Sequence, residues 1–195
     1  MTFLDLARSR RSVRRYKPDA VPDELLQQVL EAGRWAPSAV SSQPWEFIVV
    51  TDPTAKQALY DLAGVLGLKW KQLLEAPMVL VICARRLTPY SRDDCIFAGE
   101  NMLLAAAALG LGTCWIGGFN EARMKRLLSI PQSYILPGML TLGYPAHEPP
   151  APPRRELAEM VHHDTFESRG LDLSHVRRIG QIMKKLWRLQ RPGRP

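Results

Sequence analysis

The chain has 195 residues, enough for one domain with a sizeable hydrophobic core. No apolar run reaches the roughly 18 to 20 residues that span a bilayer, and the N-terminus lacks the pattern of a secretory signal, so we expect a soluble cytoplasmic protein. The net charge of +7 is compatible with nucleic acid, an anionic membrane or a phosphorylated small molecule as the partner. The distribution of that charge along the chain has to distinguish among them.

The cysteines and histidines predict neither a disulfide framework nor a metal site. Cys83, Cys95 and Cys114 lie far apart in apolar surroundings and form no CxxC pair, so we interpret them as buried structural thiols. No HExxH motif, Ser-His-Asp set or Cys-His pair is evident, so we assign no catalytic side chain and no metal ligand. The histidines are His147, His162, His163 and His175.

A basic segment follows a short N-terminal helix. Thr2 can cap that helix with Asp5 at its third position. The next segment, 10–16, contains four arginines and a serine, which together suit a phosphate group because guanidinium groups bind phosphate oxygens in pairs. Taken alone, the segment is more readily explained as a solvated run of charge on the surface, and the motifs further along the chain change that balance.

A helix and a small-residue loop come next. Pro22 opens a segment with apolar residues at helical spacing, and Gly33 stands where a C-terminal cap is expected. Residues 36–45 form a proline-bracketed loop of small hydroxyl residues that leads into a buried strand over 46–51. Such a loop can approach a flat ligand closely.

The middle of the chain alternates strands and helices. We expect a helix over 53–63, a strand over 77–84 with both faces covered, and a long, nearly apolar helix over 93–109 that also suits a subunit interface. A strand over 113–116 runs into two glycines, after which Asn120 can cap a further helix.

The last strand and the C-terminal part differ in composition. The strand over 136–144 is expected to be interrupted by a proline and a glycine, and a proline-rich connector then leads to Arg154. Beyond residue 163, eight basic residues against three acidic ones give about +5 of the net charge. We therefore expect a domain over 1–163 and a basic extension over 164–195, with an amphipathic helix capped by Ser174.

Several separated motifs, in this order, resemble the FMN-dependent nitroreductase family. Residues 10–16 match the pattern Arg-Arg-Ser-x-Arg-x-aromatic, and residues 37–45 match Pro-Ser-x-x-x-x-Gln-Pro-Trp. The resemblance continues through 101–106, 109–119, 142–145 and 154–162. It implies an α+β fold with a mixed, mostly antiparallel sheet flanked by helices, and an intertwined homodimer that holds two FMN molecules at its interface.

The resemblance also assigns residues to the cofactor. Arg10 and Ser12, with Arg154 from the far end of the domain, would bind the FMN phosphate, and Arg11 contributes to the same segment. Arg14 would lie nearer the N1/C2=O edge of the flavin, where a cation favours the anionic reduced form.

A loop and a glycine pair complete this set. The loop over 37–43 would lie against the flavin from the partner subunit, and the backbone N–H groups of Gly117 and Gly118 would approach flavin N5 and O4. The residues assigned to FMN are Arg10, Arg11, Ser12, Arg14, Pro37, Ser38, Ala39, Val40, Ser41, Gln43, Ile116, Gly117, Gly118 and Arg154. Two of them depart from the common family pattern, because many members have Asn in place of Ser41 and an acidic residue in place of Gly117.

The implied function is oxidoreduction centred on the flavin. NADH or NADPH would pass a hydride to FMN and leave, and a small oxidant such as a nitroaromatic or a quinone would then take its place, which is ping-pong turnover. Related branches of the fold carry out dehalogenation and other specialised flavin reactions, so the same cofactor with another reaction stays open. A nucleic-acid or membrane-surface binding protein driven by the basic extension is a third reading, but it leaves the loop and the glycines unexplained, so we expect neither nucleic acid nor a membrane as a partner.

Overall fold

The computed structural model describes residues 2–65, 67–167 and 180. The chain divides into two units, Met1–Pro150 and Ala151–Pro195, and each is described by itself. The amphipathic helix expected after Ser174 lies outside the described residues, as does most of the basic extension.

The first unit is built on a four-stranded antiparallel sheet. Its strand order is β1 (Trp45–Val50), β2 (Met78–Arg85), β4 (Tyr134–Gly143) and β3 (Gly112–Ile116). A parallel bridge between Ser12 and Thr113 adds the basic segment to the β3 edge. The expected α+β class with a mostly antiparallel sheet is confirmed.

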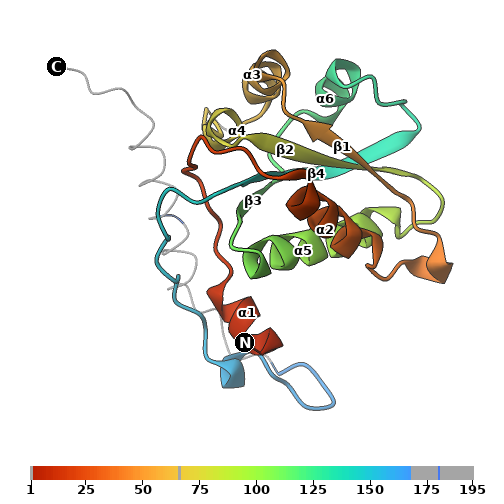
Figure 1. The fold of residues 1–195 in the computed structure, drawn as a ribbon. Helices are drawn as coiled ribbons and strands as arrows, with labels where there is room; N and C mark the ends of the chain where they lie inside the picture. Colours follow the sequence, from red (N-terminus) through yellow and green to blue (C-terminus); the bar gives the residue numbers. More distant parts are fainter. Residues whose placement is uncertain (1, 66, 168–179, 181–195) are drawn as a thin grey trace. The chain divides into compact units, whose positions relative to one another are not determined.

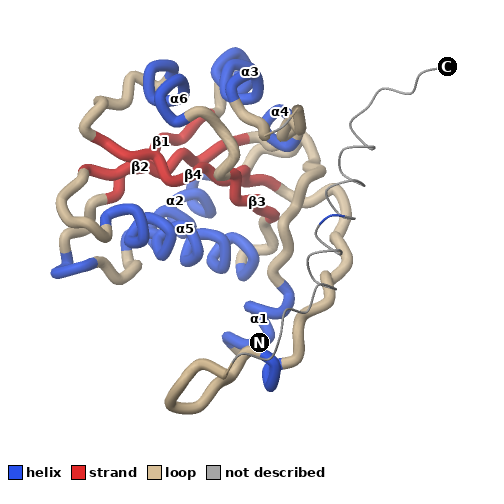
Figure 2. Tube along the Cα trace, turned by 180° about the vertical axis from the view of Figure 1, so that it is seen from behind, coloured by secondary structure: helices blue, strands red, loops and turns tan. Residues whose placement is uncertain are grey.

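Helices cover both faces of this sheet, as Figures 1 and 2 show. The helices on one face are α2 (Asp23–Arg34) and α5 (Ser91–Ala108). The helices on the other face are α3 (Pro53–Leu62), α4 (Gln72–Glu75) and α6 (Glu121–Leu127).

Strand β2 supplies both hydrophobic layers through its alternating side chains. Leu80 and Ile82 belong to the core under α2 and α5, while Val79 and Val81 belong to the core under α3 and α6. All four are fully buried. Because successive strand residues point to opposite faces, a strand covered on both sides is apolar throughout, as the sequence predicted.

The helix caps expected at Thr2 and Asn120 are present. Thr2 and Asp5 form a capping box at the start of α1 (Phe3–Ser9), and the Asn120 side chain accepts a hydrogen bond from the Arg123 N–H at the start of α6. Just after α5, Gly110 adopts a φ of 74°, a conformation that glycine takes without steric cost.

Two expectations about glycine and proline were wrong. Gly33 lies inside α2 rather than after it, and a Cβ there would stand 2.8 Å from Cγ of Met102 on α5. It is therefore a close-packing residue between two helices. Strand β4 is continuous through Pro137 and Gly138, because the change of pairing register with β2 accommodates the proline.

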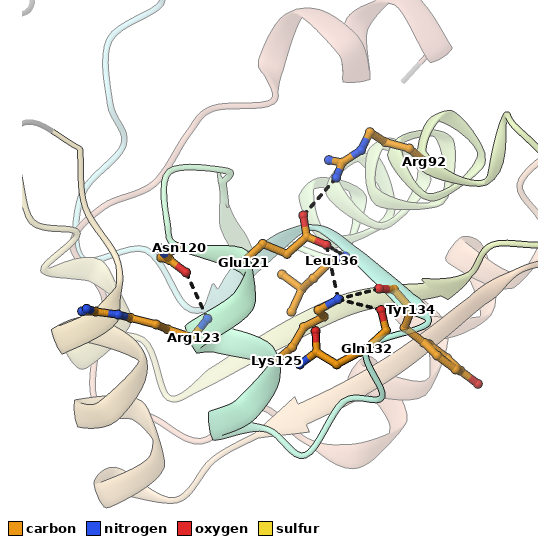
Figure 3. A network of polar contacts seen from close by, with 8 residues as sticks. All are labelled: Arg92, Asn120, Glu121, Arg123, Lys125, Gln132, Tyr134 and Leu136. Carbon is orange, nitrogen blue, oxygen red and sulfur yellow. Dashed lines mark hydrogen bonds and ion pairs between the residues drawn. The ribbon is translucent and has the colours of Figure 1, made fainter.

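A polar network ties α6 to the sheet and to α5 (Figure 3). The buried Lys125 donates hydrogen bonds to the backbone oxygens of Gln132 (3.1 Å) and Tyr134 (2.8 Å). Glu121 accepts a hydrogen bond from the Leu136 N–H at 3.1 Å and pairs with Arg92 of α5 at 3.2 Å. The two carbonyl oxygens satisfy the Lys125 ammonium group, whose burial without acceptors would be costly.

The three cysteines are free and buried, in line with the structural role expected for them. Burial raises the pKa of Cys83 to about 11 and that of Cys95 to about 12, because the thiolate form is disfavoured away from water.

Among the described helices, none has the length and apolar composition required to cross a membrane.

The second unit contains a short helical turn, η2 (Leu157–Glu159). Arg155 pairs with Glu159 at 3.3 Å next to this turn. Arg154, expected at the FMN phosphate, belongs to this unit, so its approach to Arg10 stays a prediction.

Candidate flavin site

The basic segment is held along the sheet by the aromatic residue that ends its motif. The Tyr16 hydroxyl contacts the Val13 carbonyl oxygen at 2.8 Å and Thr141 Oγ1 at 2.6 Å. The Val13 N–H donates to the Thr113 carbonyl oxygen at 2.8 Å, next to the parallel bridge. The arginines are therefore displayed from a backbone bound to β3 and β4.

Arg10 and Arg11 line a cavity of about 340 Å³ at the C-terminal end of α5, beside Ala107 and Gly112. The Nε atoms of both arginines are buried and have no hydrogen-bond partner in the part of the chain that the structure describes. A buried N–H of a cation without an acceptor is costly, so the two atoms point to an anionic ligand. The donor set fits the phosphate of FMN.

The arginines of the segment have different surroundings. Arg11 also donates from Nη1 to the carbonyl oxygens of Arg8 and Arg10, which satisfies the C-terminal end of α1. Arg14 is exposed, and its Nη1 donates to the Ser12 carbonyl oxygen at 3.3 Å. Arg10 therefore has the side chain most available for a phosphate.

Ile116 ends β3, and Gly117 and Gly118 follow it. Neither glycine N–H donates a hydrogen bond to the described chain, whereas the Gly118 carbonyl oxygen accepts bonds from Trp70 Nε1 (2.9 Å) and the Gly64 N–H (2.8 Å). The turn thus keeps its donors free while its acceptor is occupied. No sequence pattern indicated this role of Trp70.

The small-residue loop has an unusual backbone. Its centre is a single 3₁₀ turn, η1 (Ala39–Ser41), and Val40, Ser41 and Gln43 have φ values of 47°, 55° and 43°. With Pro37 and Ser38, Ser41 and Gln43 line a second cavity, of about 380 Å³.

One chain does not bring the loop and the arginines together. The Ala39 N–H donates to Asp94 near the N-terminal end of α5, whereas Arg10 lies beside Ala107 near its C-terminal end. At 1.5 Å per residue, the thirteen steps between these two helix positions correspond to about 20 Å. In Figure 1 the loop that follows α2 lies far from α1 and from the basic segment that follows α1.

The first unit combines an antiparallel sheet covered by helices on both faces with an arginine-rich segment at one edge of the sheet. The family model described as "Nitroreductase family" matches residues 7–144. The chain belongs to the nitroreductase family.

Individual relatives agree with this assignment. An NADH dehydrogenase of Thermus thermophilus is 33% identical, with 73% of this chain and 86% of the relative covered. An iodotyrosine deiodinase of Thermotoga neapolitana is 31% identical, with 83% and 97% covered. The structure of an FMN-dependent nitroreductase from Clostridium difficile R20291 superimposes with a TM-score of 0.77 at 28% identity, covering 84% of this chain and 100% of that one.

Proposed function

We propose that this protein reduces small organic oxidants, nitroaromatics or quinones, as an FMN-dependent NAD(P)H oxidoreductase. The enzyme class and its cofactors follow from family membership and from the relatives described above. The observation that carries the cofactor site is the pair of buried, unpartnered arginine Nε atoms beside β3.

The chain's own residues bind and orient the cofactor. Arg10 and Ser12, together with Arg154, would hold the phosphate, and Arg14 would place a positive charge near the flavin edge. The N–H groups of Gly117 and Gly118, which have no acceptor among the described residues, would donate to the flavin ring. Bound FMN supplies the hydride chemistry, and no side chain of the described residues is required as an acid or base.

The site is completed by a second copy of the chain. The roughly 20 Å between the loop and the arginines along α5 supports a homodimer in which the loop over 37–43 serves the partner's FMN. Apolar side chains exposed on this copy supply a surface for that assembly, and they include Trp35, Val40, Ile96 and Phe97.

The phosphate assignment is tested by the double variant Arg10→Ala/Arg154→Ala. We expect folded protein that loses its visible flavin band after FMN addition and desalting. The matched control is Arg123→Ala/Arg126→Ala, which removes two exposed positive charges on α6 and is expected to keep the flavin. A full flavin complement in the Arg10/Arg154 variant would overturn the assignment.

Reductive dehalogenation is the second candidate, because a deiodinase is among the relatives at 31% identity over 83% of this chain. Anaerobic reduction by NADH and NADPH, followed by a nitroaromatic, a quinone and iodotyrosine as oxidants, separates the two. Reoxidation of the reduced flavin by the nitroaromatic or the quinone but not by iodotyrosine supports the proposed function. Reoxidation by iodotyrosine but by neither of the other two favours dehalogenation.

A further inference from the structure

The loop over 37–43 has a backbone conformation that its residues disfavour. Val40 is β-branched and has φ 47° and ψ 30°, in the left-handed region where a Cβ meets the backbone. Its side chain is 91% exposed, so packing within this chain does not compensate. Strain of this kind persists only where surrounding contacts impose it.

One such contact comes from a buried acid on α5. Asp94 is 2% exposed, and its Oδ1 accepts a hydrogen bond from the Ala39 N–H at 3.1 Å, immediately before Val40. Its Oδ2 is also buried and has no partner in the part of the chain that the structure describes. An apolar residue would avoid this desolvation cost, so retaining a carboxyl group here points to a requirement for the loop anchor.

The rest of the loop is braced locally. Ser38 Oγ accepts the Gln43 N–H at 3.0 Å, and the Ser41 N–H donates to the Ser38 carbonyl oxygen at 3.0 Å. These bonds close the turn on itself. The hydrogen bond from the Ala39 N–H to Asp94 joins the turn to α5 and thereby orients it on the molecule.

We propose that Asp94 is a positioning residue for the flavin site of the partner subunit, acting by holding Val40 and Ser41 in the left-handed conformation that presents them to the partner's FMN. The inference rests on the proposed function for the cofactor and the dimer. Asp94 itself touches no ligand. It acts on the site of the partner subunit, because Asp94 and the arginines of its own chain lie near opposite ends of α5.

Three variants of α5 test the anchor. Asp94→Ala removes the acceptor, and we expect the Kd for FMN to rise at least about tenfold, the effect of losing one charge-assisted hydrogen bond. Asp94→Asn keeps a side-chain oxygen for the Ala39 N–H and is expected to stay within about threefold of wild type. Asp93→Ala removes an exposed acid from the same helical turn and controls for the effect of charge on the helix end.

A subunit-mixing experiment tests action in trans. In a heterodimer of an Arg10→Ala chain and an Asp94→Ala chain, one site receives both lesions and the other receives neither. We expect one FMN per heterodimer, at a concentration at which neither parental homodimer retains flavin. Action within the same chain would instead damage both sites once each.

Each outcome bears on the proposal. A heterodimer without flavin, or an Asp94→Ala homodimer with wild-type FMN affinity, overturns it. Loss of FMN in Asp94→Asn equal to that in Asp94→Ala also overturns it, because the acceptor oxygen is then not what matters. Failure of the wild-type protein to bind FMN would instead refute the proposed function, so the two failures are distinguishable.

Discussion

The Tyr16 side chain fixes the backbone of the basic segment against the sheet. Its hydroxyl contacts the Val13 carbonyl oxygen and the fully buried Thr141, and burial raises the pKa of Tyr16 so that it stays a neutral donor. The aromatic position of the motif therefore has a mechanical role. It binds the backbone of the arginines to β4 and does not itself provide charge for the ligand.

Tyr16→Phe tests this role. The ring is kept, but two hydrogen bonds are lost and buried polar groups at Val13 and Thr141 lose a partner, so we expect unfolding to become easier by about 1 to 3 kcal/mol. Urea unfolding of the cofactor-free protein measures the change. The control is Tyr90→Phe, whose ring is exposed and whose stability should stay within about 0.5 kcal/mol of wild type. Equal stabilities for the two variants would contradict the anchoring role.

Helix α5 and strand β4 meet through Trp115 of β3. A Cβ at Gly99 of α5 would stand 2.4 Å from the indole ring, and one at Gly138 of β4 would stand 2.2 Å from it. The ring thus fills a slot that two glycines leave between a helix and a strand. Because an indole is rigid and protein interiors are close-packed, neither side has room for a methyl group.

Gly138→Ala is therefore expected to destabilise the protein by about 1 to 3 kcal/mol through overpacking. The measurement is the urea midpoint, compared with that of Gly117→Ala, where the new Cβ would meet the same ring at an ordinary 3.5 Å. We expect Gly117→Ala to change stability little in the absence of cofactor. Combining Gly138→Ala with Trp115→Leu should cost less than the two changes added together, because the smaller side chain vacates the slot.

The limits of sequence reasoning lie at these contacts between elements. Hydrophobic periodicity and caps predicted the strands, the main helices and their approximate ends, since those signals are local. Gly33 was interpreted as a cap and Gly138 as an interruption, because a glycine required by a neighbour from elsewhere in the chain looks like any other glycine. The motifs indicated the arginines and the loop, but not Trp70 or Asp94, whose roles depend on partners distant in sequence.

The folded molecule is expected to lose stability at alkaline pH. Burial raises the pKa of Cys83 to about 11 and that of Cys95 to about 12, from a usual 9.0. The resulting stabilisation is fully present below the unfolded pKa and is lost as the pH rises through the folded values, because the unfolded thiols ionise first. The thermal midpoint should therefore fall above about pH 9, and the fall should be shallower in Cys83→Ala/Cys95→Ala. An identical slope in that variant would contradict the assignment to these thiols.

Assembly and cofactor binding are expected to be inseparable, because each proposed site takes its arginines from one copy and its loop from the other. Phe97 on α5 is 50% exposed, and Phe97→Glu places a charge in the proposed interface. We expect a monomer with a native circular dichroism spectrum and no retained FMN, with the mass measured by sedimentation. The control is Leu127→Glu on α6, which is 38% exposed and covers the opposite face of the sheet. A Phe97→Glu monomer that still retained FMN would show that one chain completes the site, and the loop would then need another role.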